Sequence, residues 1–182
     1  MKQKKLIASS LALIILAIIN YTALSAPNIS ALFSSCDAIQ EQLISLIQQE
    51  HKKIQIAVFR LSDKQIAQAL IEQKNKGITI EIITDSGGLD SRITKILLLH
   101  QAKIPIFIYP TNSTNQGLMH HKFCLFFENS SNSEQIVWTG SYNFSQAANT
   151  KNQENVIIAR DITIFSQYCK AFSELKALCL PL

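Results

Sequence analysis

The sequence lacks the spacings by which cysteine and histidine usually hold a metal. It has four cysteines, none in a CxxC pair or a Cys/His ligand pattern: Cys36, Cys124, Cys169 and Cys179. We therefore expect no zinc site. An even number of cysteines permits disulfides in an oxidising compartment, but three pairings are possible and the sequence does not choose among them. Cys124 lies in an apolar stretch that predicts a buried strand, so we expect a packed thiol there.

The chain also lacks a strong excess of either charge outside its first residues. The formal net charge is +4, but three of the positive charges are Lys2, Lys4 and Lys5, and the first 25 residues contain no acid. Without this segment, 14 basic residues stand against 13 acidic ones. The overall charge therefore does not indicate nucleic-acid binding, and any attraction for phosphate must be local.

Internal repeats and low-complexity segments are absent as well. With 182 residues, 47% of them hydrophobic, the chain can form one domain with a substantial core but not two of ordinary size. We expect a leader over residues 1–25, a linker over residues 26–35 and a single domain over residues 36–182.

The leader has the features of an export signal peptide. Lysines precede an apolar run from Leu6 to Ile19, and the small residues Ala23 and Ser25 offer a cleavage site. An uncleaved membrane anchor is the alternative, because the stretch without charge continues to Asp37 and roughly 20 apolar residues span a bilayer. In either case the domain would lie outside the cytoplasm, whether periplasmic, secreted or anchored, and residues 6–26 could associate with a membrane.

Hydrophobic periodicity alternates between helix and strand along the domain. Helices are predicted over 37–52, 62–76, 90–101, 144–149 and 161–178, and strands over 53–59, 78–84, 104–109, 118–127, 135–139 and 154–159. Ser62 and Gln65 have capping-box spacing, and Gly77 is expected to end the helix that they open. The alternation favours parallel pairing, with a hairpin in the second half. We therefore expect an α/β fold with a mixed, mostly parallel sheet and helices on both faces.

The segment Met119-His120-His121-Lys122 is the first candidate for chemistry. Alternate side chains of a strand share a face, so His120 and Lys122 are expected to point the same way and His121 the opposite way. An imidazole can attack or donate a proton near neutral pH, and an ammonium offsets the charge of phosphate oxygens. Alone, such a pair is more often structural than functional.

Two downstream segments add polar groups. Ser141 and Asn143 follow Gly140 at a strand-to-helix corner, where a hydroxyl and an amide can donate to phosphate, or can simply cap the helix. Glu154 opens the next strand. Its carboxylate would fix the tautomer of a nearby imidazole and stabilise its protonated form, or would be solvated at a strand edge.

Taken together, these residues resemble the phospholipase D superfamily, in its small branch of bacterial endonuclease-like and mitochondrial cardiolipin hydrolase-like proteins with one HxK motif. The resemblance extends over residues 36–178. The motif residues are His120 and Lys122 for HxK, Gly140, Ser141 and Asn143 for GSxN, and Glu154 for the later acidic position.

The resemblance implies a phosphodiesterase with His120, Lys122 and Glu154 as catalytic residues and with Ser141, Asn143 and Lys122 as phosphate ligands. One His120 would form a phosphohistidine, while a second histidine protonates the leaving oxygen and then activates water. Since the chain has one HxK, a homodimer with a shared site would supply both histidines. No metal or cofactor is needed, because lysine and the polar donors stabilise the charge.

One position departs from the family pattern. The pattern continues as HxKxxxxD, and the aspartate position holds Phe127, with Glu128 one residue later. By strand parity Glu128 would face the same way as His120 from a shifted place. The departure leaves open a degenerate homologue that binds phosphate without cleaving it.

The substrate class stays open between a phospholipid and a nucleic acid, because both present the same phosphodiester. Export or anchoring near a membrane and the near-neutral charge favour lipid, since duplex binding usually needs a basic surface. The single-motif branch, however, includes nonspecific endonucleases. The loop over residues 109–117, just before the motif, is expected to line the cleft, yet it contains neither a cation nor an apolar patch.

Overall fold

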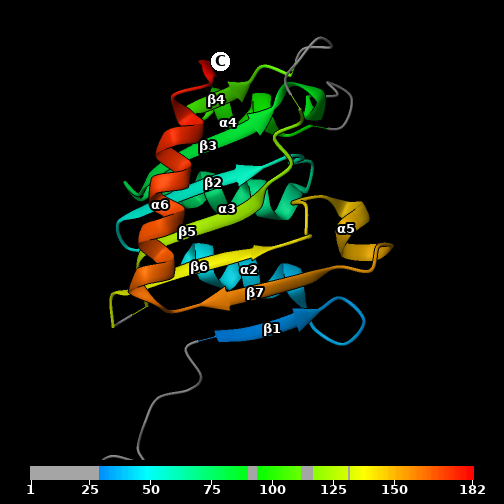
Figure 1. Ribbon diagram of the computed structural model, residues 1–182, viewed down its shortest axis with the longest axis vertical. Coiled ribbons are helices and arrows are strands. Elements are labelled where there is room, and N and C mark those ends of the chain that lie inside the picture. The colour runs from blue at the N-terminus through cyan, green and yellow to red at the C-terminus, as the bar shows by residue number, and fades with distance from the viewer. Residues whose placement is uncertain (1–28, 90–93, 112–116, 131) are drawn as a thin grey trace, which may run out of the picture.

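An eight-stranded sheet forms the centre of the domain (Figure 1), which the computed structural model describes over residues 29–89, 94–111, 117–130 and 132–182. The strand order is β1-β7-β6-β5-β2-β3-β4-β8. The strands are β1 (Ile29–Phe33), β2 (Lys53–Val58), β3 (Thr79–Asp85), β4 (Ile106–Tyr109), β5 (Lys122–Asn129), β6 (Glu134–Gly140), β7 (Asn155–Ala159) and β8 (Leu180–Pro181).

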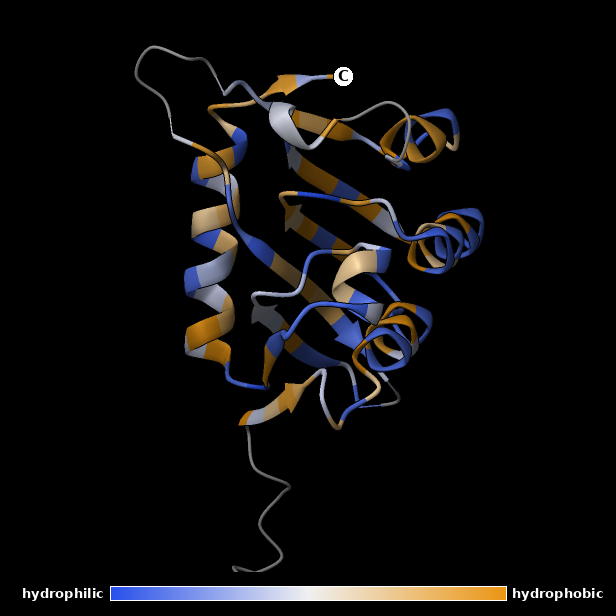
Figure 2. Cartoon of the chain, turned by 90° about the vertical axis from the view of Figure 1, so that its right-hand side faces the viewer, coloured by the Kyte–Doolittle hydropathy of each residue, from blue (hydrophilic) through white to orange (hydrophobic). Residues whose placement is uncertain are grey.

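Helices cover both faces of this sheet, as the view along its edge in Figure 2 shows. The helices are α2 (Ile39–Gln48), α3 (Lys64–Asn75), α4 (Ile96–Gln101), α5 (Gln146–Thr150) and α6 (Ile162–Lys176). α2, α3 and α4 pack on one face and α6 crosses the other, while the short α5 connects β6 to β7. The larger apolar core lies under α2, α3 and α4 and the smaller one under α6. The predicted α/β fold with helices on both faces is confirmed.

The sheet is mixed, as predicted, but it is less parallel than predicted. Only the pairs β2–β3 and β3–β4 are parallel among the described strands, while the pairs along β2-β5-β6-β7-β1 and the pair β4–β8 are antiparallel. A parallel neighbour requires a long crossover, which α3 and α4 provide. The hairpin from β5 to β6 and the short return through α5 reverse the chain instead.

The predicted linker over residues 26–35 is wrong in part, because residues 29–33 form β1 at the edge of the sheet. β1 pairs antiparallel with β7, from Ile29 opposite Ala159 to Phe33 opposite Asn155. Its residues are alternately exposed and half-buried, so no buried face imposes a strong apolar alternation on the sequence. The pairing partner, rather than the local pattern, makes this segment a strand.

The ends of α3 confirm one predicted signal and correct another. Its N-cap is Asp63 and not Ser62, because the Asp63 carboxylate accepts hydrogen bonds from the backbone N–H groups of Gln65 at 2.9 Å and Ile66 at 3.0 Å. Gly77 follows the helix with a φ of +93°, the left-handed conformation that glycine adopts without steric cost.

The predicted leader over residues 1–25, with its cleavage site, lies outside the described residues. Within the described ranges, no helix combines the length and the hydropathy that a bilayer crossing requires. All four cysteines have free thiols. Cys124 is fully buried in β5, as expected, and burial raises its pKa well above the usual value for a thiol.

A single carboxylate, that of Glu81 on β3, ties α6 to the sheet. It accepts a hydrogen bond from Gln55 Nε2 at 2.8 Å, lies 2.9 Å from Lys53 Nζ and also binds the ammonium of Lys176 on α6. Burial opposes the ionisation of Glu81, but the hydrogen bonds from Lys176, Lys53 and Gln55 outweigh it and lower its pKa to about 2.

We expect the free energy of unfolding to fall in acid as Glu81 takes up a proton. Its pKa drops on folding from 4.5 to about 2, so its charge stabilises the fold above pH 4.5, and that contribution is lost as the pH falls towards 2. Solvent screening at the partly exposed Lys176 limits the contribution to about 1 kcal/mol. Urea unfolding of the wild type and Glu81→Gln at pH 7 and pH 3 tests this expectation. The stability difference between the two proteins should narrow at pH 3, and a constant difference would contradict it.

Candidate active site

The imidazole of His120 and the ammonium of Lys122 lie in direct contact at the site edge, which is the end of the sheet where β2 and β6 finish and β5 and β7 begin. Lys122 Nζ lies 2.8 Å from His120 Nδ1 and donates a hydrogen bond to the His120 carbonyl oxygen at 2.7 Å. β5 begins at Lys122, later than the predicted strand, yet the two side chains still meet. The ring of His121 lies 5.7 Å from that of Phe123, away from the pair. The geometry therefore joins His120 to Lys122 and separates His121 from both.

The three basic side chains also differ in burial and in the charges around them. The side chain of Lys122 is buried, which lowers its pKa, and the negative charge of Glu154 partly offsets that change. The pKa of His121 is lowered by burial and then by the positive charges of Lys122 and His120. Both His120 and His121 are exposed to solvent, whereas Lys122, which follows them at the start of β5, is buried.

The antiparallel part of the sheet brings distant residues to this edge. Val58 at the end of β2 pairs with Lys122 at the start of β5, and Gly140 at the end of β6 pairs with Val156 near the start of β7. In an antiparallel sheet, the carboxyl end of one strand lies beside the amino end of the next. The residues that follow β2 and β6 and those that precede β5 and β7 therefore share one edge.

Glu154 and Ser141 form a hydrogen-bonded pair at this edge. The Ser141 hydroxyl donates to Glu154 Oε2, and Asn152 Nδ2 donates to Glu154 Oε1 at 2.9 Å. Ser141 Oγ also accepts the N–H of Asn155 at 3.1 Å. Both carboxylate oxygens thus have a partner other than His120, and the only hydroxyl proton of Ser141 is already donated. The Glu154 carboxylate therefore acts on Lys122 through its charge rather than orienting His120 by a hydrogen bond.

Asn143 is held so that its amide N–H groups remain available. Its Oδ1 accepts the backbone N–H of Arg60 at 3.2 Å, and its Nδ2 has no acceptor among the described residues. Neither Ser141 nor Asn143 caps α5, because the N-cap is Ser145, whose hydroxyl accepts from Ala148 N at 3.3 Å. The capping alternative for the two residues is therefore wrong.

Gly140 allows β6 and β7 to approach each other just before Ser141. A Cβ atom at this position would lie 2.1 Å from the carbonyl oxygen of Asn155, a backbone atom that no side-chain rotation can move away. Glycine is thus required here by close packing of two backbones and not by an unusual φ. The glycine of the GSxN segment sets the spacing that lets Ser141 meet Glu154.

The residues from the predicted linker reach this site too. Ser34, directly after β1, accepts the backbone N–H of Glu154 on its Oγ at 2.9 Å and donates to the carbonyl oxygen of Asn152 at 3.1 Å. Its own N–H donates to the carbonyl oxygen of Glu154 at 3.0 Å. Ser34, at the end of β1, therefore fixes the backbone of Glu154 and so the position of its buried carboxylate.

The sequence alone did not indicate Phe59, whose ring lies beside the imidazole, or Arg60, which follows it. The ring centroid of Phe59 is 5.0 Å from that of His120, and Lys122 Nζ is 5.6 Å from the Phe59 centroid. The guanidinium carbon of Arg60 is 6.0 Å from the same ring. Both residues follow β2, and only the pairing of β2 with β5 places them at the site.

The departure at Phe127 lies far from this edge. Phe127 packs its ring edge-on against Phe165, with centroids 5.0 Å apart, and the Lys53 ammonium is 5.2 Å from its centroid. The register shift between Phe126 and Asn129 breaks strand parity, so the expectation that Glu128 shares the face of His120 does not apply. At about 3.3 Å per strand residue, Phe127 lies roughly 20 Å along the chain from His120.

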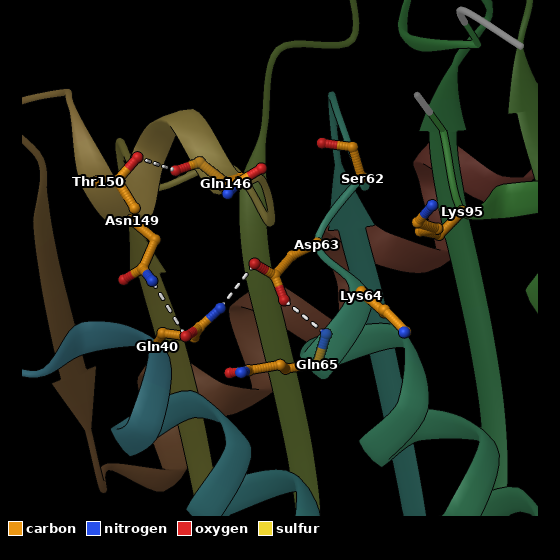
Figure 3. Close-up of a pocket in the computed structure, with 9 residues that line it drawn as sticks. All are labelled: Gln40, Ser62, Asp63, Lys64, Gln65, Lys95, Gln146, Asn149 and Thr150. Carbon is orange, nitrogen blue, oxygen red and sulfur yellow. Dashed lines mark hydrogen bonds between the residues drawn. The ribbon is translucent and has the colours of Figure 1, made fainter. Parts of the chain in front are cut away.

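A separate polar cavity of about 430 Å³ opens on the side of α2 and α3 (Figure 3). Gln40 connects its walls, because Gln40 Nε2 donates to Asp63 Oδ2 at 2.6 Å and Gln40 Oε1 accepts from Asn149 Nδ2 at 3.0 Å. Lys64 and Lys95 lie on the other side of the cavity, and none of the predicted site residues lines it. The sequence-derived candidates thus converge at the sheet edge and not in this cavity.

No cluster of three or more His, Cys, Asp or Glu side chains suited to a metal ion occurs in the part of the chain that the structure describes. The polar loop expected to line the cleft falls largely on residues 112–116, outside the described residues.

Comparison with known proteins identifies the class to which this fold and site belong. The family model for the cardiolipin synthase, phospholipase D-like domain matches residues 43–176. The chain therefore belongs to the phospholipase D superfamily, as its motifs had suggested.

Individual relatives agree with this assignment. The phospholipase D of Rickettsia prowazekii is 30% identical over 153 residues, which cover 82% of this chain and 70% of that protein. The mitochondrial cardiolipin hydrolase of Xenopus tropicalis is 26% identical over 139 residues, which cover 76% of this chain and 61% of that protein. Among solved structures, Nuc from Salmonella typhimurium, a phospholipase D family member, has the same fold. Its TM-score is 0.73 at 20% identity, over 85% of this chain and 97% of that one.

Proposed function

We propose that this protein hydrolyses phosphodiester bonds through a phosphohistidine formed on His120. The observation that supports this proposal most directly is the 2.8 Å contact between His120 Nδ1 and Lys122 Nζ at the sheet edge that also carries Asn143 and Glu154. A nucleophilic or acidic imidazole, a cation and an amide donor meet there, and each has a defined part in cleaving a charged ester.

The contact with Lys122 determines which nitrogen of His120 carries a proton. When the ammonium donates to Nδ1, the ring is neutral with its proton on Nε2, whereas a ring that protonates a leaving oxygen must be an imidazolium with a proton on both nitrogens. For attack, Nε2 needs its lone pair, so the proton must lie on Nδ1 and the ammonium must turn to a phosphate oxygen. Binding of the phosphate provides that new partner for Lys122.

The proposed reaction has two displacements at phosphorus. In the first, the Nε2 lone pair of one His120 forms the N–P bond while the P–O bond to the leaving group breaks, and that oxygen takes the Nε2 proton of a second histidine. In the second, the now neutral second histidine takes a proton from water. The water oxygen bonds to phosphorus as the N–P bond breaks, which restores both rings.

The remaining groups stabilise the charge that develops on the non-bridging oxygens. Lys122 supplies a buried positive charge, and Asn143 supplies amide N–H groups that are held in place through Oδ1. The nearby guanidinium of Arg60 can add a further cation. Glu154 partly sustains the protonated form of Lys122, because its negative charge raises the pKa that burial lowers.

The second histidine is proposed to come from a second copy of the chain. The chain contains four histidines. His121 points towards Phe123, His51 lies just before β2 at the opposite edge of the sheet, and His100 lies in the last turn of α4. A two-fold homodimer with its axis through the site would bring a second His120 and Lys122 to the same phosphate.

We expect the active species to be a dimer of this 20.4 kDa chain. Sedimentation velocity with activity measured across the boundary tests its mass. Subunit exchange with an excess of His120→Ala chains should depress wild-type turnover more than dilution does, because each mixed dimer lacks one of its two imidazoles. Exchange with His121→Ala chains is the matched control and should keep turnover per chain within about threefold of wild type. An active monomer would contradict the shared site.

We further propose a phospholipid as the substrate. The similar proteins from Rickettsia and Xenopus are named phospholipase D and mitochondrial cardiolipin hydrolase, and the near-neutral charge of the chain beyond its first residues lacks the basic surface of duplex binders. Turnover of bis(p-nitrophenyl) phosphate separates an enzyme from a binding protein. Parallel assays on phosphatidylcholine, cardiolipin, single-stranded DNA and RNA test the substrate. Faster cleavage of the nucleic acids would identify an endonuclease instead.

A further inference from the structure

Asp85 is a fully buried carboxylate that the proposed reaction does not use. It is the last residue of β3 and begins the turn Asp85–Gly88 beside the site edge. A buried carboxylate is costly unless hydrogen bonds satisfy its oxygens. Its partners therefore indicate what it holds in place.

Its two oxygens connect the turn to the segment just before the HxK motif. Oδ1 accepts the N–H of Gly87 at 2.7 Å, which fixes the turn itself. Oδ2 accepts the backbone N–H of Met119 at 2.8 Å and the Thr111 hydroxyl at 2.5 Å. Thr111 and Met119 flank residues 112–116, so one oxygen anchors the chain on both sides of that segment.

Met119 transmits this constraint directly to the imidazole. Its side chain is 3% exposed and packs in the apolar cluster of Ala57 and Ile83 beneath α6. Met119 is thus held through its side chain on one side and through its N–H on the other. The next residue is His120, whose Cα is one peptide unit away.

The same turn supports His120 from a second direction. A Cβ atom on Gly88 would lie 1.9 Å from the carbonyl oxygen of Phe59, so the turn packs directly on the Phe59 backbone. The N–H of Phe59 donates to the His121 carbonyl oxygen at 3.0 Å, and its ring packs on His120. The residues on both sides of His120 therefore depend on where this turn lies.

We propose that Asp85 is the positioning residue of His120, acting through the Met119 N–H. This role rests on the proposed function, because it concerns the alignment of the imidazole with phosphorus. A displacement of about 1 Å in a reacting group can cost roughly a hundredfold in rate while binding is retained. Lys122 is also held in β5 by its pairing with Val58, and Asn143 and Glu154 lie between β6 and β7, so we expect phosphate binding to depend less on Asp85 than the alignment of His120 does.

Asp85→Asn tests the proposal with a nearly isosteric change. An amide has one accepting oxygen, whereas the N–H groups of Gly87 and Met119 each need an acceptor, so one of them is left facing the amide NH₂. On bis(p-nitrophenyl) phosphate we expect kcat to fall by roughly 10- to 100-fold while KM changes by less than about threefold. A wild-type kcat in this variant would overturn the proposal.

Asp63→Asn is the matched control. Asp63 is also buried, and its Oδ1 also caps the element that follows it. Its Oδ2 also accepts from a residue distant in sequence, but that residue is Gln40 on α2 and not the residue before His120. We expect this variant to lose thermal stability comparably and to keep its kcat. An equal loss of kcat in both variants would show a general effect of destabilisation and overturn the specific role.

Thr111→Val gives a second readout if Asp85→Asn does not fold. It removes only the hydroxyl that donates to Oδ2 and leaves the Met119 N–H in place. We expect a several-fold fall in kcat with an unchanged KM, and an unchanged kcat would overturn the proposal. A wild type that cleaves no phosphodiester would contradict the proposed function and this role together. An active wild type with unaffected variants would contradict the role alone.

Discussion

Replacement of His120 by alanine is expected to abolish phosphodiester turnover, lowering kcat by roughly 10³-fold or more. The imidazole of His120 is the group that is proposed both to form the bond to phosphorus and to carry a proton near neutral pH. Lys122 and Asn143 would still bind the phosphate, so the loss should appear in kcat more than in KM. Steady-state kinetics on bis(p-nitrophenyl) phosphate, and on whichever natural ester is cleaved, measure this change.

His121→Ala is the control for that experiment. The two histidines are neighbours, but His121 packs on Phe123, whereas Lys122 Nζ lies against the His120 ring. Turnover by His121→Ala should therefore stay within about threefold of wild type. A chelator should leave the rate unchanged, because the proposed charge stabilisation comes from Lys122 and Asn143. Full activity in His120→Ala would remove the basis of the proposed function.

Gly140→Ala is expected to have the largest effect on stability, lowering the free energy of unfolding by about 2–4 kcal/mol. The added methyl group would lie 2.1 Å from the Asn155 carbonyl oxygen, so β6 and β7 must separate. Because Ser141 follows directly and its Oγ accepts the N–H of Asn155, the separation would also disturb the partner of Glu154. Urea unfolding of the variant and the wild type measures the change.

Gly117→Ala provides a matched comparison for this glycine. Nothing lies within 4 Å of a Cβ at Gly117, so the same substitution should change the free energy of unfolding by less than about 0.5 kcal/mol. If Gly140→Ala proved as stable as Gly117→Ala, the close approach of the two strands would not be a constraint on this position.

The helices and central strands follow from local sequence patterns, but the pairing directions do not. The apolar periodicity of α2, α3 and α6 and the β-branched runs of β2 and β3 were readable because each element buries one face or both. The sequence does not predict β1, because β1 has no buried face. It does not predict β8 either, because a strand of two residues, Leu180 and Pro181, is too short to show a pattern. Parallel pairing was overestimated, because the alternation of helix and strand does not say which strand lies next to which.

The site was predictable where its residues form a compact motif and not where they are isolated. His120, Lys122, Ser141, Asn143 and Glu154 stand in short segments whose composition suggests phosphate chemistry, and the structure gathers all five at one edge. The partners within the site were harder to predict. Glu154 binds Ser141 rather than His120, because β6 and β7 are direct neighbours in the sheet.

The sequence by itself determined the class of protein, the residues proposed to carry the chemistry and most of the elements that hold them. These properties depend on residue type and on spacing along the chain, and both can be read from the sequence without knowledge of the fold. Only the tertiary structure decided that Phe59, Arg60 and Asp85 stand beside or behind the imidazole. Phe59 and Arg60 follow β2 and Asp85 ends β3, and their places result from sheet pairings between strands that are remote in sequence, which no local pattern encodes.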